Sequence, residues 1–165
     1  TKSTKSPAAL SLRAPCAIVP GMDLAAIAAR FRVPGRLVTL GPTGSGNVND
    51  TYLAVFRTAF SEERVILQRI NRRVFKRPTW IMSNMRTLTA HAHRRLEREA
   101  PNEDRVWQLP RVIAAKDGRD WFRGADGEYW RAITLMASAA SHERAQGVEH
   151  ALEAGTVVGQ FHRLV

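Results

Sequence analysis

The sequence predicts an α+β protein in which an antiparallel sheet of about five strands packs against one long helix. Short apolar and β-branched runs follow one another between residues 37 and 70, with brief polar turns between them, as in an antiparallel meander. One strong helical period comes next, and two or three further strand-like runs follow it. Because one amphipathic helix can cover only one face of a sheet, these elements form a single two-layer lobe.

Three segments divide the chain by composition. Residues 1–22 are rich in Ser, Thr, Lys, Pro and Ala without sustained periodicity, and we interpret them as a tail or a processed end. Residues 23–137 carry the sheet and the long helix. Residues 138–165 contain a polar linker, near residues 137–146, and a last helix that lies apart from the sheet.

Each element has its own local signal. Asp23 is suited to cap a short helix, since Leu24, Ile27 and Phe31 follow it at helical spacing. The predicted strands occupy residues 37–40, 49–56, 64–70, 111–115 and 128–136, with a further short strand at Trp121 and Phe122. The polar turn before the third strand is Ser61-Glu62-Glu63. The long helix covers residues 78–100, with an apolar stripe of Ile81, Met85, Leu88, Ala92 and Leu96. The last helix is marked by Ala154, Val157, Phe161 and Leu164.

The composition excludes several classes of protein. With 165 residues, 44% of them hydrophobic and 24% charged, the chain has room for about one domain with a real core. No run approaches the roughly 18 apolar residues of a membrane helix, and prolines interrupt the first twenty residues. We therefore expect a cytoplasmic protein without a membrane partner. The single cysteine, Cys16, excludes a disulfide scaffold and a zinc module.

The charge is strongly basic, with a formal net charge of +10. Such an excess attracts polyanions such as nucleic acid, anionic membrane or nucleotide phosphates. The basic residues are scattered through residues 64–76, 94–98 and 105–123, without the interleaved aromatic rings of a platform for single strands. A solvated basic surface is the simpler interpretation of the charge. A basic nucleic-acid-binding module remains the alternative function.

The glycine-rich turn Gly44-Ser45-Gly46-Asn47 is the first candidate for chemistry. Glycines permit positive φ and let backbone amides approach a phosphate closely. The turn is not a P-loop, because no Gly-Lys-Ser/Thr follows, and it is not a dinucleotide fingerprint, because a strand rather than a helix comes next. A plain hairpin turn would have the same sequence pattern.

The third predicted strand carries the second candidate, a polar pair formed by Gln68 and Arg69. In kinase-type sites a cation on this strand reaches the nucleotide phosphates. Adjacent strand residues point to opposite sheet faces, so only one of the two can face a nucleotide, and periodicity leaves the choice open. Arg69 could offer a bidentate fork to phosphate oxygens, or it could simply face solvent.

These segments resemble the first lobe of the aminoglycoside-phosphotransferase and choline-kinase superfamily. The likeness rests on residues 44–52, on Leu67-Gln68-Arg69-Ile70-Asn71, and on Val74-Phe75-Lys76 followed by Pro78. Within that superfamily the chain is most similar to bacterial N-acetylhexosamine kinases, which phosphorylate the anomeric oxygen of an amino sugar with ATP and magnesium. The likeness is strongest over residues 44–85 and looser up to residue 165.

The resemblance implies a protein-kinase-like N-terminal lobe followed by the first helix of a C-terminal lobe. It implies ATP and Mg²⁺ as cofactors and a small hydroxylated acceptor such as an N-acetylhexosamine. Residues 134–137 would form the hinge. The nucleotide-binding residues it implies are Gly44, Ser45, Gly46, Asn47, Val48, Asn49 and Asp50 over the phosphates, Gln68 or Arg69 at the cation position, and Leu135 and Met136 beside adenine.

The chain departs from the family pattern in two respects. The cation position has no Lys, and residues 80–96, which should hold its glutamate partner, contain no acid. The family's His-x-Asp loop, its following Asn and its second Asp have no counterpart in the chain, so we assign no catalytic or metal-binding residue. We expect a truncated protein that is inactive alone, or an inactive kinase-like remnant. The sequence does not identify the phosphate acceptor or the oligomeric state.

Overall fold

A computed structural model of the protein describes residues 23–44, 48–99, 107–136, 142 and 144–165. The predicted tail with Cys16, the turn residues Ser45, Gly46 and Asn47, and part of the predicted linker lie outside these residues. The described chain confirms the predicted α+β class, with one antiparallel sheet and three helices among these residues.

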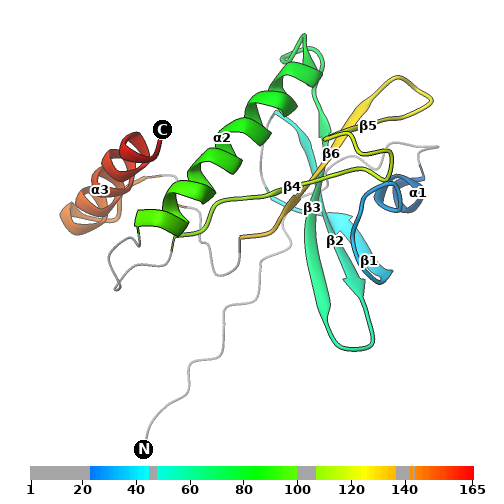
Figure 1. The fold of residues 1–165 in the computed structure, drawn as a ribbon, viewed down its shortest axis with the longest axis horizontal. Helices are drawn as coiled ribbons and strands as arrows, with labels where there is room; N and C mark the ends of the chain where they lie inside the picture. The colour runs from blue at the N-terminus through cyan, green and yellow to red at the C-terminus, as the bar shows by residue number, and fades with distance from the viewer. Residues whose placement is uncertain (1–22, 45–47, 100–106, 137–141, 143) are drawn as a thin grey trace, which may run out of the picture.

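The sheet has six antiparallel strands in the order β1-β2-β3-β6-β4, and β5 also pairs with β6 (Figure 1). The strands are β1 (Arg36–Pro42), β2 (Asp50–Arg57), β3 (Glu62–Ile70), β4 (Val112–Ile113), β5 (Phe122–Arg123) and β6 (Tyr129–Thr134). The helices are α1 (Leu24–Ala28), α2 (Pro78–Glu99) and α3 (Val148–Leu164). The chain forms a three-strand meander, passes through α2, and then adds β6 beside β3. This order places β3 in the middle of the sheet.

The strand boundaries differ most from the prediction in β3 and β4. Glu62 and Glu63 pair with Arg57 and Phe56, so they belong to β3 and the predicted turn there is wrong. The strand predicted over residues 111–115 is reduced to the two residues of β4. It ends early because the next carbonyl, on residue 114, accepts a hydrogen bond from the segment after α1 instead of continuing along β6.

The long helix α2 is confirmed, and four residues of its predicted apolar stripe, Ile81, Met85, Ala92 and Leu96, are buried or half-buried. Met82 and Ala92 are buried and Thr89 is half-buried, whereas Leu88 is 41% exposed. Thr89 tolerates this position because its hydroxyl donates to the Met85 carbonyl at 2.8 Å. Figure 1 shows that only the first half of α2 lies against the sheet, while its far end extends toward α3.

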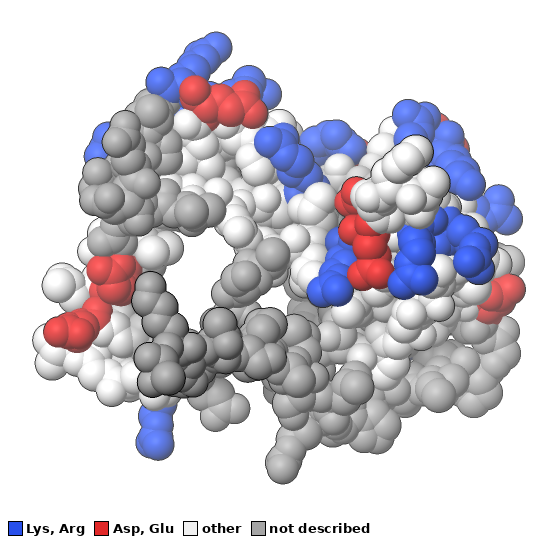
Figure 2. Space-filling view, turned by 90° about the horizontal axis from the view of Figure 1, so that it is seen from below, with Lys and Arg blue, Asp and Glu red and all other residues white. Residues whose placement is uncertain are grey.

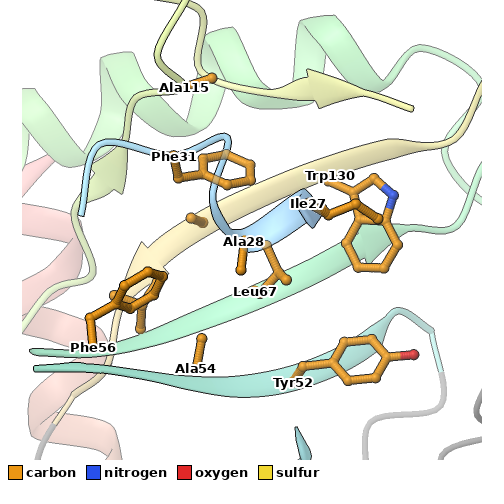
Figure 3. Close-up of a cluster of buried hydrophobic side chains, with 11 residues drawn as sticks. Ile27, Ala28, Phe31, Tyr52, Ala54, Phe56, Leu67, Ala115 and Trp130 are labelled. Carbon is orange, nitrogen blue, oxygen red and sulfur yellow. The ribbon is translucent and has the colours of Figure 1, made fainter. Parts of the chain in front are cut away.

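The main hydrophobic core lies on the sheet face opposite α2 (Figure 3). It brings α1 and the segment after it against alternate residues of β2, β3 and β6. The prediction that the long helix alone covers the sheet is therefore wrong. Burial of each large apolar side chain contributes about 1.5–3 kcal/mol. The core consists of Ile27, Ala28, Phe31, Tyr52, Ala54, Phe56, Val65, Leu67, Ala115, Trp130 and Ala132.

The predicted cap of α1 is confirmed, because the Asp23 carboxylate accepts a hydrogen bond from the Ala26 amide at 2.9 Å. The helix is shorter than predicted and ends before Phe31. Phe31 is nevertheless buried, since its backbone forms an isolated bridge with Ala115 and its ring enters the core.

Replacement of the cap tests how much α1 contributes to the core. We expect Asp23→Ala to lower the free energy of unfolding by about 1 kcal/mol, because the Ala26 amide loses its acceptor. Asp23→Asn, which keeps a capping oxygen, should cost much less. Urea unfolding followed by circular dichroism measures both variants. Equal losses for the two variants would show that the cap does not hold the helix.

The last helix, α3, packs against the far end of α2 rather than against the sheet (Figure 1). Arg95 of α2 donates to the Arg163 carbonyl at 3.2 Å. Only the last turn of α3 is covered, so Leu164 is buried as predicted, while Ala154 and Val157 are exposed. Among the described helices, none combines the length and apolarity needed to cross a bilayer.

Candidate functional site

The two faces of β3 carry different chemistry, and the strand register assigns each side chain to a face. The core face holds Val65, Leu67 and Arg69, with Asp50 and Trp130 on either side of Arg69. We call the opposite face the α2-side face. Its cross-strand rows include Val55–Arg64–Leu135, Leu53–Ile66–Ile133 and Thr51–Gln68–Arg131, followed at the end of β3 by the pair Ile70–Tyr129. The prediction that Gln68 and Arg69 point to opposite faces is confirmed.

Arg69 is engaged by a carboxylate on the core face. Its Nε donates to Asp50 Oδ2 at 2.7 Å, and a second guanidinium nitrogen forms an ion pair with the same oxygen. Burial alone would lower the pKa of Arg69, but the hydrogen bond to Asp50 and the charge of that carboxylate outweigh it and raise the pKa. Arg69 is therefore a neutralised cation in this structure.

A cleft of about 480 Å³ lies at this end of the sheet. Four of the predicted site residues line it, namely Val48, Asn49, Asp50 and Arg69. Its other lining residues are Asn71, Arg72, Arg73 and Glu128. The Asn49 carboxamide accepts a hydrogen bond from the Asn71 amide at 3.0 Å, which fastens the start of β2 to the end of β3.

Gln68 lies in a hydrogen-bonded row on the α2-side face. Its Nε2 donates to Thr51 Oγ1 at 3.0 Å, and its Oε1 accepts from Arg131 Nε at 2.8 Å. Arg131 Nη1 points to the thioether sulfurs of α2, at 3.4 Å from Met85 and 4.0 Å from Met82. Burial lowers the pKa of Arg131, and no nearby carboxylate opposes that effect in the described part of the chain.

The sequence did not reveal Arg131 or Thr51 as members of the site. Arg131 was part of a predicted strand, and only the register between β3 and β6 places it beside Gln68, 63 residues away. One local signal could have pointed to it. An arginine in the middle of the run Tyr-Trp-Arg-Ala-Ile-Thr breaks an otherwise apolar strand, and such a charge needs a partner when it is half-buried.

Gly44 of the glycine turn and the described residues of the predicted hinge lie at opposite ends of the sheet. Gly44 has φ of +76°, a conformation that suits glycine, while Ser45, Gly46 and Asn47 lie outside the described residues. Leu135 follows β6 and its amide donates to the Arg64 carbonyl at 3.4 Å. Met136 is 42% exposed next to it. The structure thus separates the predicted site residues into the cleft, the Gln68 row and the hinge.

Many of the described basic residues are engaged locally. On the face shown in Figure 2, Lys and Arg lie in separate groups, several of them beside acidic residues. Five arginines also lie over aromatic rings, which leaves those rings less free to stack on bases. These pairs are Arg30 with Phe122, Arg72 and Arg123 with Tyr129, Arg77 with Trp80, and Arg119 with Trp121. The geometry does not favour a single-strand binding platform on these rings.

No protein-family model matches the chain. The arrangement of its own side chains must therefore support any function. Within the described ranges, no cluster of three or more His, Cys, Asp or Glu side chains could hold a metal ion.

Proposed function

We propose that this chain is the ATP-binding lobe of a phosphotransferase that acts on a small hydroxylated substrate, most similar to N-acetylhexosamine kinases. The observation that supports it is the order of groups along the α2-side face. From the hinge residue Leu135, an apolar row of Leu53, Ile66 and Ile133 comes first, and the polar row Thr51–Gln68–Arg131 comes second. Beyond the polar row lie the pair Ile70–Tyr129 and Gly44, the first residue of the glycine turn.

This order matches the polarity of a nucleoside triphosphate laid along the strands. The apolar row is only half-buried, so it offers a surface for a base next to the hinge backbone. The polar row offers donors to phosphates, and the turn with Gly44 offers backbone amides. At about 3.3 Å per residue, the hinge and polar rows lie about 13 Å apart along β3. Base and phosphates can therefore bind at different rows at the same time.

The other face of β3 suits a triphosphate less well, although the cleft lies there. Asp50 and Glu128 both line that cleft, and Asp50 already neutralises Arg69. A phosphate in the cleft would meet these two carboxylates as well as Arg72 and Arg73, which also line it. In kinase-type sites, moreover, the strand-three cation faces the helix that follows the strand. In this chain that residue is Gln68, so we assign the predicted cation position to Gln68 rather than Arg69.

The proposed lobe binds nucleotide but does not complete a catalytic site. The described residues offer no group of three or more side chains that could hold a metal ion by themselves, so a Mg²⁺ ion would depend on the nucleotide phosphates and on further ligands. Phosphoryl transfer depends on such metal and cation stabilisation. The chain alone is therefore proposed to bind ATP without turnover, and a cytoplasmic location accords with this role.

Titration of the 165-residue chain with a non-hydrolysable ATP analogue tests the proposal. We expect the backbone amide NMR signals of Gly44, Gln68 and Leu135 to shift together, because one ligand spans the whole α2-side face. Adenosine should shift the hinge signals and leave the glycine turn nearly unchanged. Titration with a single-stranded oligonucleotide serves as the comparison for a nucleic-acid-binding module. Absence of any shift with ATP at millimolar concentration would refute the proposal and leave an inactive remnant.

A further inference from the structure

Arg131 carries a charge that the described residues do not neutralise. Its side chain is half-buried between β3 and α2. A guanidinium has five N–H donors. Nε is satisfied by Gln68, and Nη1 meets only thioether sulfurs, which are weak acceptors. Nη2 has no acceptor among the residues that the structure describes, so at least two strong donors are left for a ligand.

Leaving such a cation without an anion is energetically unfavourable. A partly buried charge loses hydration, and an opposite charge must replace that loss if the site is to be stable. Arg69, in the same sheet, is a cation whose charge is neutralised by a protein carboxylate, that of Asp50. Arg131 has instead two methionines on the helix side, where a kinase-type site would place a glutamate. The methionines keep the guanidinium in place without cancelling its charge.

Gln68 explains how Arg131 is held in position. The amide oxygen of Gln68 fixes Arg131 Nε, and the amide nitrogen is fixed in turn by Thr51. Both nitrogen and oxygen of the Gln68 side chain are thereby used within the row. Gln68 therefore acts as a positioning residue, and the charge comes from the neighbouring strand.

We infer that Arg131, oriented by Gln68, binds a phosphate group of the nucleotide and takes over the role of the cation that is missing from the third strand. This inference rests on the proposed function, because the nucleotide supplies the anion. The location supports a phosphate rather than another anion, since Arg131 lies in the row between the apolar base surface and the glycine turn. A planar, permanently charged fork can donate two parallel hydrogen bonds to phosphate oxygens.

The test measures the affinities of ATP, ADP and adenosine for the full 165-residue chain and its variants by calorimetry. We expect Arg131→Met to weaken ATP binding by about tenfold or more, because charge-assisted hydrogen bonds are lost. Adenosine affinity should change by less than about twofold, since the base surface is unaltered. Arg131→Lys, which keeps the charge but loses the fork, should fall between Met and wild type.

Arg69→Gln is the matched control. It removes a cation from the residue next to Gln68 on β3, whose side chain lies on the core face of the sheet. ATP affinity should remain near the wild-type value in that variant. Thermal unfolding separates binding from folding: a methionine beside Met82 and Met85 should keep or raise the melting temperature of the free chain. Arg131→Gln, which can still reach Gln68, provides the affinity measurement if the methionine variant does not fold.

The possible results distinguish two failures. If the wild-type chain binds ATP and Arg131→Met binds it equally well, the inference is overturned and the proposed function stands. If ATP and adenosine lose affinity equally, Arg131 has only a structural role and the inference is again overturned. If the wild-type chain binds neither ATP nor adenosine, the proposed function fails and the inference fails with it.

Discussion

Replacing Trp130 by alanine is expected to lower the free energy of unfolding by about 3–5 kcal/mol. Trp130 is 0% exposed and lies on the core face of β6, with the Tyr52 ring centroid 6.0 Å away. Figure 3 shows its indole beside Ile27 of α1, so the side chain joins the sheet to the helix that packs on that face. Small domains are stable by about 5–15 kcal/mol, so the variant should be close to unfolding at room temperature.

Two further variants separate volume from hydrogen bonding. The Trp130 Nε1 has no hydrogen-bond partner within the described structure, although it is buried. Trp130→Phe removes that unsatisfied donor and keeps most of the ring volume, so it should cost less than half as much as alanine. Trp121→Ala is the matched control, because Trp121 is half-buried and contacts Tyr129 and Arg119 at the surface.

Urea unfolding followed by far-ultraviolet circular dichroism measures all three variants without depending on tryptophan fluorescence. Trp130→Ala should lower the free energy of unfolding most, and Trp121→Ala and Trp130→Phe should each lower it less. If Trp130→Ala cost no more than Trp121→Ala, the core would not be centred on the face that packs against α1. The position of the hydrophobic core would then have to be reassigned to the α2 side.

Local patterns predicted most of the elements because their determinants lie close together in sequence. The meander depends on three runs joined by short turns, and the cap of α1 depends on Asp23 and the amide of Ala26 alone. The placement of the core was not predictable in this way. It depends on the bridge between Phe31 and Ala115, which joins positions 84 residues apart. Periodicity cannot report a contact over that separation.

For the candidate site, too, the features set by neighbouring residues were predictable and those set by distant residues were not. Strand alternation alone predicted that the side chains of Gln68 and Arg69 lie on opposite faces of the sheet. The register of β2 and β3 confirms this prediction. Periodicity could not say which face α2 covers, because that depends on how Met82 and Met85 meet β6. The position of α2 shows that Gln68 is the residue facing it. Because Gln68 is uncharged, the cation on this face is its hydrogen-bonded neighbour Arg131. Whether these groups bind a nucleotide stays a prediction.

Gly35 is the position where a small substitution should disturb the hairpin most. Its φ is +91°, which costs an L-residue about 1–2 kcal/mol. A Cβ at this position would lie 2.5 Å from the Arg57 carbonyl oxygen and 2.7 Å from its carbon. Both are backbone atoms at the end of β2, so a side chain cannot rotate away to relieve the contact. Forced displacement should add about 1–3 kcal/mol.

Gly35→Ala is therefore expected to lower the free energy of unfolding by about 2–5 kcal/mol. Gly118→Ala isolates the backbone contribution, because Gly118 has φ of +87° but its nearest neighbour would be an Arg32 side-chain nitrogen at 3.8 Å. That control should lose only about 1–2 kcal/mol. Equal losses in urea unfolding would show that the end of β2 moves freely enough to accept the extra methyl group.

The same substitution also connects the fold to the proposed site. β1 begins directly after Gly35 and ends at Pro42, next to the turn with Gly44. A displacement of β1 at its start should therefore alter the turn at its end, where the phosphates are proposed to bind. We expect Gly35→Ala to weaken ATP more than adenosine, and Gly118→Ala to leave both affinities unchanged. A loss of stability without a selective loss of ATP affinity would mean that the turn is held by β2, through the hydrogen bond that the Asn71 amide donates to Asn49, rather than by β1.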